Sequence, residues 1–137
     1  WTDEPYADGV VLVGDAAGWN DPLLGLGLSI TYRDVRMVSD ILLATDDWSM
    51  VDFRAYGDER RERLRRLRFI GNIQSRIEVE FGPEAVERRK SYLRRSASDP
   101  FLRAGGLAVL GGPERAPAEY FTPEGFARVL DLADAEQ

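Results

Sequence analysis

The sequence predicts a mainly α-helical chain with one buried strand near its start, of the kind that belongs to an open α/β sheet. Val10–Val13 is an uninterrupted apolar run, which is typical of a strand buried on both faces. From about Gly27 onward, apolar residues recur at helical spacing, and no second run predicts a strand. Because one strand cannot make a sheet, we expect its partners to lie elsewhere.

The composition indicates a soluble globular protein and limits its chemistry. The chain has 137 residues, enough for one domain, with 44% hydrophobic and 31% charged residues. Its net charge of −6 argues against binding to nucleic acid or to an anionic membrane, and favours a small molecule or a protein as partner. Without cysteine or histidine it has no disulfide, thiolate nucleophile, Ser-His-Asp arrangement or zinc motif, and we predict no metal site.

We expect a cytoplasmic protein and a piece of a longer gene product. The longest apolar stretch, Leu23–Ile30, contains two glycines and is far shorter than the roughly 20 residues needed to cross a bilayer. No secretory or transit segment is visible, and the chain begins at Trp1 rather than at a methionine.

The first third of the chain predicts a turn, a strand and a helix. The polar approach Trp1–Gly9 ends in a turn-forming Asp8-Gly9 pair ahead of the strand. A helix is predicted over about Gly27–Leu43, with Asp34 and other charged residues on its outer face. The apolar face expected for this helix comprises Leu28, Thr31, Val35, Val38 and Leu42.

Four further helices are predicted. A long one runs from about Ser49 to Phe81, with Asp46-Asp47 as its cap and Gly82-Pro83 as its end signal. Gly57 and Gly71 weaken it locally, so we expect it to be bent or split. Its apolar stripe comprises Leu64, Leu67, Ile70, Ile73, Ile77 and Phe81. The others are Pro83 to about Arg95, a short helix opened by Asp99-Pro100, and one near Phe126–Leu132 started by Thr122-Pro123, with Gly105–Pro117 as a loop or loosely helical link.

The segment after the strand suggests a ligand site. Asp15 follows Gly14 at the carboxyl end of the predicted strand, where α/β sheets bind ligands, and its carboxylate can accept hydrogen bonds from sugar or polyol hydroxyls. The helix that begins near Gly27 would present free N–H groups and its positive dipole end to the same crevice. Together they describe a ligand with a polyol arm and an electron-rich head.

The run VVLVGDAAGWNDPLLGLGLSITYRDVRMVSDIL closely resembles the second flavin-binding motif of FAD-dependent monooxygenases of the aromatic-hydroxylase type and of related reductases and halogenases. In that family a strand ends in Gly-Asp-Ala-Ala, a proline follows, and a Gly-x-Gly turn opens a helix. The resemblance is close over about the first third of the chain and loose over the helical remainder. It implies an α/β flavoprotein with a Rossmann-like FAD/NAD(P)-binding fold.

Carried over residue by residue, the resemblance assigns cofactor contacts. Asp15 would contact the ribityl chain of FAD, Gly14 would allow close backbone approach, and Pro22 would lie beside the isoalloxazine ring. The Gly-x-Gly turn would bring the helix start to the pyrimidine edge of the flavin. The cofactor-binding residues implied are Gly14, Asp15, Ala16, Pro22, Gly25, Gly27, Leu28 and Ser29.

Two differences from the family pattern leave the substrate and reaction subtype open, and a third concerns the extent of the chain. Gly18, followed by Trp19, stands where many members have histidine, and Ser29 stands where asparagine often opens the helix. The glycine-rich motif that holds the cofactor pyrophosphate has no match in this sequence. The resemblance therefore implies the carboxyl-terminal part of the protein, with 1–45 completing an FAD-binding domain, 46–137 a helical region, and the amino-terminal part of the same protein as a partner.

The function implied is an oxidoreductase, in particular a monooxygenase that acts on a small organic substrate with reduced flavin and oxygen and with NAD(P)H as electron donor. Catalytic residues are not assigned, and the chain alone is expected to be inactive. A flavin-dependent reductase or halogenase of the same superfamily and a non-catalytic helical interaction module remain open. So does a nucleic-acid binder based on Arg60–Arg68, although interleaved glutamates favour a solvated helix face there.

Some residues also have purely structural interpretations. Gly14-Asp15 could be an ordinary turn in which Asp15 caps a helix. Trp19 could stack on a ligand or anchor a loop on the core. Asp34 could be a structural partner of Arg33 or a neighbouring arginine, or a cofactor contact.

Overall fold

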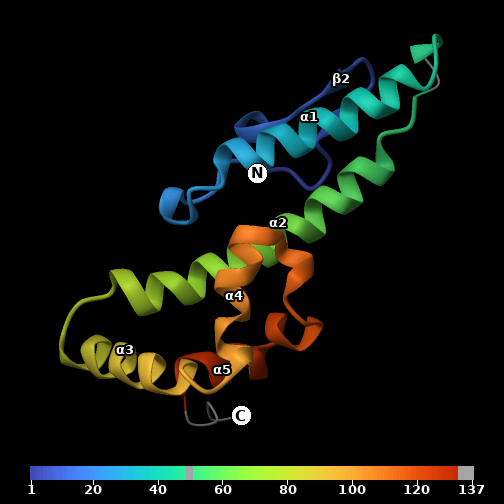
Figure 1. The fold of residues 1–137 in the computed structure, drawn as a ribbon. Coiled ribbons are helices and arrows are strands. Elements are labelled where there is room, and N and C mark those ends of the chain that lie inside the picture. Colours follow the sequence, from blue (N-terminus) through green and yellow to red (C-terminus); the bar gives the residue numbers. More distant parts are fainter. Residues whose placement is uncertain (49–50, 133–137) are drawn as a thin grey trace. The chain divides into compact units, whose positions relative to one another are not determined.

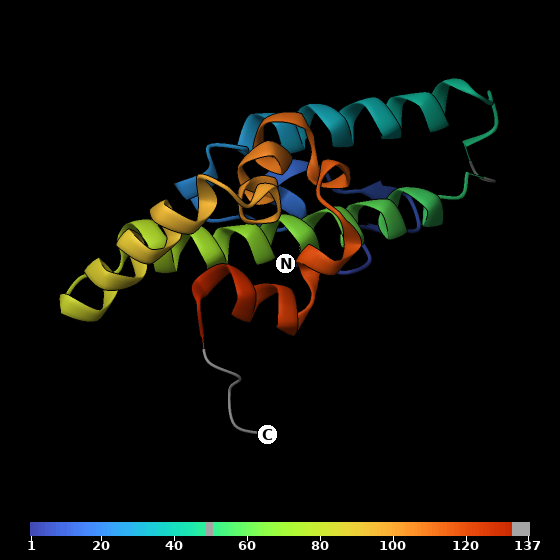
Figure 2. The same cartoon turned by 60° about the horizontal axis from the view of Figure 1, so that its bottom comes forward.

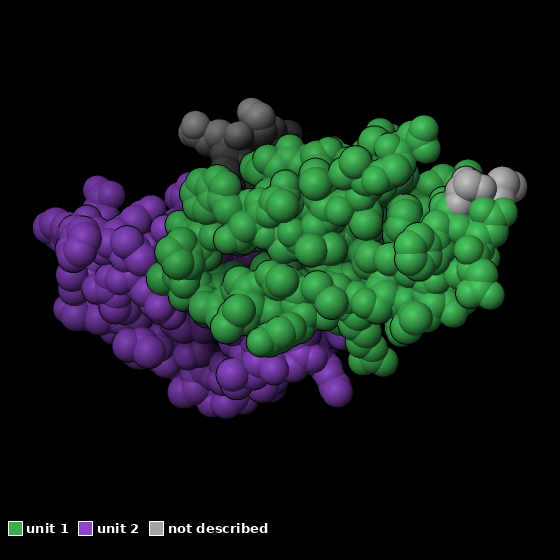
Figure 3. Space-filling view, turned by 90° about the horizontal axis from the view of Figure 1, so that it is seen from above, with its two compact units in different colours: residues 1–65 green, residues 66–137 purple. Residues whose placement is uncertain are grey.

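The computed structural model describes residues 1–48 and 51–132. The chain divides into two compact units, Trp1–Arg65 (unit 1) and Arg66–Gln137 (unit 2) (Figure 3). The described chain is mainly helical with one two-stranded sheet, which confirms the predicted helical character (Figure 1). The predicted division after residue 45 falls inside unit 1. None of the helices in the described ranges combines the length and the apolar character needed to cross a membrane.

Unit 1 begins with a short β-hairpin. Strand β1 (Tyr6–Ala7) pairs antiparallel with β2 (Val10–Val11) across the predicted Asp8-Gly9 turn. The backbone N–H of Leu12 donates to the carbonyl of Pro5 at 2.7 Å and extends the pairing. The prediction of a strand buried on both faces is wrong in this chain, because β2 has one neighbour in the described sheet and the Val10 side chain is 54% exposed.

Two 3-10 turns lead from the hairpin into the first helix. These are η1 (Gly14–Ala17) and η2 (Pro22–Leu24), and α1 spans Gly27–Leu43 as predicted. The predicted apolar face is wrong in part, because Leu28 is 71% and Val35 is 44% exposed, while Val38 is buried as expected. The buried face of α1 consists of Ile30, Asp34 and Val38. The helix turns this face inward because the charge of Asp34 finds cationic partners within unit 1.

Helix α2 (Arg54–Gln74) continues into a π-helical turn, η4 (Ser75–Val79). The predicted start at Ser49, where Asp46-Asp47 would act as the cap, lies outside the described residues. The described helix begins at Arg54, and the side chain of Asp52 accepts a hydrogen bond from the Arg54 N–H at 2.9 Å. The helix runs unbroken through both of its glycines.

The apolar stripe of α2 is confirmed except at its end. The buried members are Leu64, Leu67, Ile70, Ile73 and Ile77. Phe81 is wrongly predicted, since it lies beyond the last helical residue and is 95% exposed. The Glu80 N–H donates to the Ser75 carbonyl five residues back, so the π-helical turn ends the helix before Phe81 can join the stripe.

Unit 2 contains three more α-helices, α3 (Pro83–Ser96), α4 (Pro100–Gly111) and α5 (Pro123–Leu130), with 3-10 turns η5 (Pro113–Arg115) and η6 (Ala118–Phe121) (Figures 1 and 2). The predicted start of α3 and the capping side chains Asp99 and Thr122 are confirmed. The last helix begins at the predicted Thr122-Pro123 and ends before Leu132.

The segment Gly105–Pro117, predicted as a loop or loosely helical link, is a regular helix in its first half, because α4 continues to Gly111. Its small residues allow close packing: a Cβ on Gly105 would lie 2.3 Å from the Tyr120 hydroxyl. The core beside it is aromatic, and the Phe69 ring meets those of Tyr120, Phe121 and Phe126 edge-on at centroid distances of 6.4, 5.8 and 5.7 Å. Packing of this kind keeps a glycine-containing helix intact despite weak helix propensity.

Candidate functional site

All eight predicted cofactor-binding residues lie in unit 1, along the stretch from η1 to the first turn of α1. Gly14 is buried. The other seven are exposed: Asp15, Ala16, Pro22, Gly25, Gly27, Leu28 and Ser29. The carboxylate of Asp15 forms no hydrogen bond within the described residues, and it does not cap a helix. The structure thus leaves this carboxylate directed at solvent on a turn that packs against α1.

Gly14 has a structural reason to be glycine. Its φ of +55° lies in the left-handed region, and a Cβ at this position would lie 2.5 Å from the Thr31 Oγ1. A side chain would therefore strain the turn and collide with α1. Its N–H is also used, because it donates to the buried Asp34 Oδ2 at 2.9 Å.

The start of α1 is open. Leu26 occupies the N-cap position without a side-chain hydrogen bond, and the helical ladder begins with the Ile30 N–H, which donates to the Leu26 carbonyl at 2.9 Å. The preceding N–H groups of an α-helix have no partner within the helix and carry its positive dipole end. No atom lies within 4 Å of a Cβ built on Gly25 or on Gly27, so these backbone positions are accessible.

A buried ion cluster supports this surface from within unit 1; we define it as Asp34, Arg60 and Arg63. Asp34 is fully buried, and the two arginine side chains are 2% and 5% exposed. The Arg60 Nε donates to Asp34 Oδ2 at 2.9 Å, and the Arg63 Nη2 donates to Asp34 Oδ1 at 2.5 Å. With the Gly14 N–H, the carboxylate accepts three hydrogen bonds, two of them from cations.

Arg60 connects the cluster to both ends of η1. Its Nη2 donates to the Gly14 carbonyl at 2.9 Å, and its Nη1 donates to the Ala17 carbonyl at 3.4 Å. The guanidinium therefore bridges the first and last residues of the turn while Asp15 and Ala16 face outward.

Further polar contacts surround the cluster. Glu59 accepts from the Arg63 Nε at 3.2 Å and pairs with the Arg33 Nη2 at 2.7 Å. The hydroxyl of Tyr56 donates to the Leu12 carbonyl at 2.7 Å. Burial raises the pKa of Tyr56 to about 12, and the negative charge of Asp34 acts in the same direction. Tyr56 is therefore neutral and ties α2 to the segment that precedes η1.

The cluster corrects the sequence prediction at three residues. Arg60 and Arg63 are not part of a solvated face, and the partners of Asp34 are these two arginines rather than Arg33. The signal was present in the spacing, because Tyr56, Arg60, Arg63 and Leu67 follow one another four, three and four residues apart, on the line that continues into the apolar stripe. Arginines on a core stripe require a buried anion, and Asp34 is the one that unit 1 supplies.

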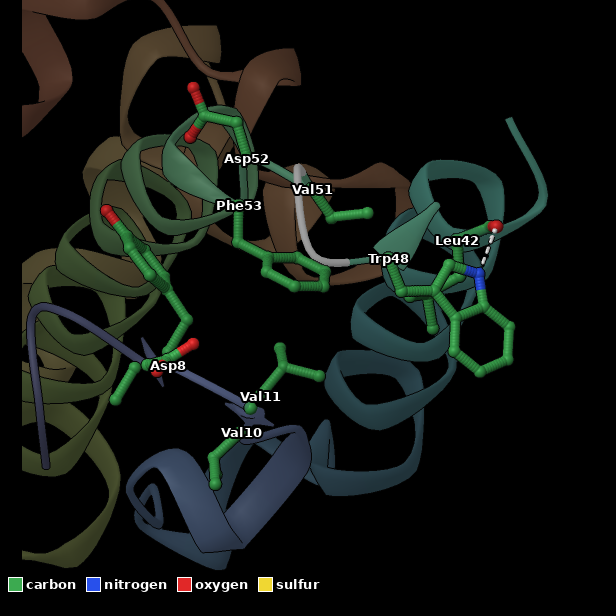
Figure 4. A pocket seen from close by; sticks show the side chains of 11 residues that line it. Asp8, Val10, Val11, Leu42, Trp48, Val51, Asp52 and Phe53 are labelled. Carbon is green, nitrogen blue, oxygen red and sulfur yellow. Dashed lines mark hydrogen bonds between the residues drawn. The ribbon is translucent and has the colours of Figure 1, made fainter. Parts of the chain in front are cut away.

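A pocket of about 600 Å³ lies elsewhere in unit 1, between the hairpin and the segment before α2, and none of the eight predicted residues lines it. Figure 4 shows Val11 and Phe53 at its wall and the Trp48 indole turned toward α1, where its Nε1 donates to the Leu42 carbonyl at 3.1 Å. Trp19, predicted as a ligand stack or a loop anchor, is 69% exposed and anchors no core. Among residues 1–48 and 51–132 there is no group of three or more acidic side chains placed to hold a metal ion.

Comparison of the chain with known proteins gives no relative: no protein-family model, no curated protein and no solved structure matches it.

Proposed function

We propose that the chain is the carboxyl-terminal part of an α/β flavoprotein, an FAD-dependent oxidoreductase of the monooxygenase type that acts on a small organic substrate with NAD(P)H as electron donor. The observation that carries the proposal is the arrangement of η1 against the first turns of α1. An exposed carboxylate lies on a turn that packs against α1 at Thr31 and Asp34, and the amino-terminal end of the same helix is open. The resemblance of the same residues to the second flavin motif supplies the identity of the ligand.

The residues present fit such a ligand. The Asp15 carboxylate has its acceptor positions free for the hydroxyls of a ribityl chain. The open start of α1 offers N–H donors at Gly27, Leu28 and Ser29 to a group that becomes negative when reduced. Pro22 is exposed ahead of the Gly25–Gly27 turn, where it could pack beside a flat ring. Flavin, when bound, would supply hydride acceptance and the activation of oxygen.

The contribution of these residues is to bind, orient and stabilise charge. Asp15 would fix the cofactor along its polyol arm. The helix end would favour the negatively charged form at the head, because its N–H groups are oriented before the charge develops and need no reorganisation. The turn Gly25–Gly27 would keep side chains out of the way of the ring, in keeping with the open space at both glycines.

The test is a comparison of two variants in the protein translated from its natural start. Asp15→Ala removes the exposed carboxylate, whereas Arg65→Ala removes an exposed arginine paired with Glu62 on α2. We expect Asp15→Ala to weaken FAD binding at least tenfold, measured by flavin fluorescence titration, and Arg65→Ala to change it less than twofold. Equal effects would refute the assignment of the motif.

A non-catalytic helical interaction module is the second candidate, favoured by large apolar side chains on the surface of unit 2. Phe81 is 95% and Leu110 is 87% exposed. Failure of the full-length protein to hold flavin would support this candidate. A reductase or halogenase of the same superfamily would share the flavin contacts, and only assays with substrates distinguish them. The nucleic-acid hypothesis is weakened, because two of the arginines on which it was based, Arg60 and Arg63, are buried in the ion cluster.

A further inference from the structure

We propose that Asp34 and Arg60 are positioning residues of the cofactor site, which hold the Asp15 carboxylate and the open end of α1 in one fixed arrangement. This inference rests on the proposed function and adds residues to it that do not themselves touch the ligand. Neither residue is exposed, so neither contacts a ligand on the η1 surface.

The η1 turn has little internal means of keeping its shape. It is a single 3-10 turn of four residues whose N-cap residue, Val13, contributes no side-chain hydrogen bond. Its closing bond runs from the Gly18 N–H to the Asp15 carbonyl at 3.1 Å. Short 3-10 turns are weak on their own, and the left-handed φ of Gly14 adds no support. The geometry of the turn therefore depends on contacts from outside it.

Asp34 and Arg60 supply such contacts at both ends of the turn, and the Thr2 N–H adds one more, to the Ala17 carbonyl at 3.2 Å. Asp34 accepts from the Gly14 N–H, and Arg60 donates to the carbonyls of Gly14 and Ala17. The two outward residues between these anchors include Asp15, whose carboxylate makes no hydrogen bond within the described part of the chain. A carboxylate that must point in a fixed direction to contact a ligand is expected to lie on a turn that is held at both ends. The Asp15 carboxylate has this arrangement.

Asp34 also links the turn to the second half of the site. It belongs to α1, whose amino-terminal N–H groups are the proposed donors to the electron-rich head of the ligand. Through its bond to Gly14 it fixes η1 against α1. Arg63 donates a hydrogen bond to the other oxygen of the Asp34 carboxylate and so stabilises its orientation.

The experiment is a double-mutant cycle in the protein translated from its natural start. Arg60→Lys keeps the charge but cannot reach Asp34 and two carbonyls at once, and Asp34→Asn keeps the shape without the charge. Each is measured alone and with Asp15→Ala, and Arg65→Lys is the exposed control on the same helix. FAD dissociation constants are determined well below the unfolding temperature of every variant, with circular dichroism to confirm folding.

We expect Arg60→Lys and Asp34→Asn each to weaken FAD binding about tenfold, and the combination with Asp15→Ala to be no more than about twofold weaker than Asp15→Ala alone, because they act through Asp15. A role confined to stability would lower the unfolding temperature and leave these constants unchanged, which would overturn the inference. Effects that multiply with Asp15→Ala would overturn it equally, because the residues would then act independently of that carboxylate.

A measurement on the unmodified protein covers variants that fail to fold. In ¹⁵N-labelled protein, FAD should shift the NMR signals of the Gly14 amide and the Arg60 Nε–H, since both belong to the support of the occupied turn. Flavin binding without any shift at these groups would refute the positioning role alone. Absence of flavin binding by the wild-type protein would refute the proposed function itself, and the inference with it.

Discussion

Truncation of Asp34 to alanine should destabilise unit 1 strongly. The carboxylate is fully buried and accepts hydrogen bonds from two guanidinium groups that are 2% and 5% exposed. The Asp34→Ala variant keeps both cations in the interior without their counterion. Removing one partner of a buried ion pair costs about 3–5 kcal/mol, largely because the remaining charge is uncompensated.

The loss of the hydrogen bond from the Gly14 N–H adds to this effect. A buried donor left without a partner costs roughly 1–3 kcal/mol, although relaxation of the turn would recover part of it. We therefore expect a decrease of about 5 kcal/mol in the free energy of unfolding, a large share of the roughly 5–15 kcal/mol that holds a domain together.

Urea unfolding followed by far-ultraviolet circular dichroism measures the total loss, and hydrogen exchange by mass spectrometry on peptides from residues 1–65 assigns it to unit 1. Arg65→Ala is the matched control, because its pair with Glu62 is about half exposed and such pairs contribute about 1 kcal/mol or less. A loss for Asp34→Ala as small as that of the control would refute the reasoning, since it would mean that the two arginines are not buried against this carboxylate.

Three further predictions concern single side chains. Gly14→Ala should lower the free energy of unfolding by about 2 kcal/mol or more, because of the positive φ at this position and the contact of the new Cβ with Thr31. A second substitution, Thr31→Ala, should restore part of that loss. Gly25→Ala, where φ is +66° and no atom lies within 4 Å of the new Cβ, should lower the free energy of unfolding by only about 1 kcal/mol in the same urea assay. The pKa of Tyr56 is raised to about 12, above its ordinary value near 10, so the unfolded chain releases this proton first as the pH rises. The stabilising effect is therefore complete below about pH 10 and declines between about pH 10 and 12. Tyr56→Phe should flatten that decline in urea titrations at about pH 9 and 11.5. In unit 2, Gly125→Ala would place a Cβ 2.3 Å from the Glu119 carbonyl oxygen and should destabilise the protein strongly. Gly106→Ala, with open space around it inside α4, should stabilise the protein by about 0.5–1 kcal/mol. If thermal unfolding found both variants less stable than wild type, the packing described for α4 would be contradicted.

The helices were largely predictable because their end signals are local. Glycines ahead of α1, the Asp99 cap of α4 and the Thr122 cap of α5 act within a few residues, which a sequence displays directly. The long-range pairing was not predictable in the same way. The inward face of α1 is set by Asp34, whose partners come 26 and 29 residues later, and apolar periodicity ignores charged residues.

Two other errors have the same origin. The run Val10–Val13 has the composition of a buried strand, but burial depends on neighbours that a local run does not specify, and the described sheet gives β2 one neighbour. The π-helical turn at Ser75–Val79 adds a residue to the last turn and takes Phe81 off the stripe. At the candidate site, the sequence indicated the eight residues between Gly14 and Ser29 but not the arginines beneath them. The assignment of flavin to that surface stays a prediction.

The measurement that tests the central proposal most directly is the visible absorption spectrum of two purified proteins, this chain and the same chain extended upstream to its natural start. We predict the visible absorption bands of a bound flavin on the extended protein only, because the glycine-rich motif that binds the cofactor pyrophosphate has no match in this chain. Flavin on neither protein, even after incubation with excess FAD, would contradict the proposal and leave η1 as a turn held in place for structural reasons.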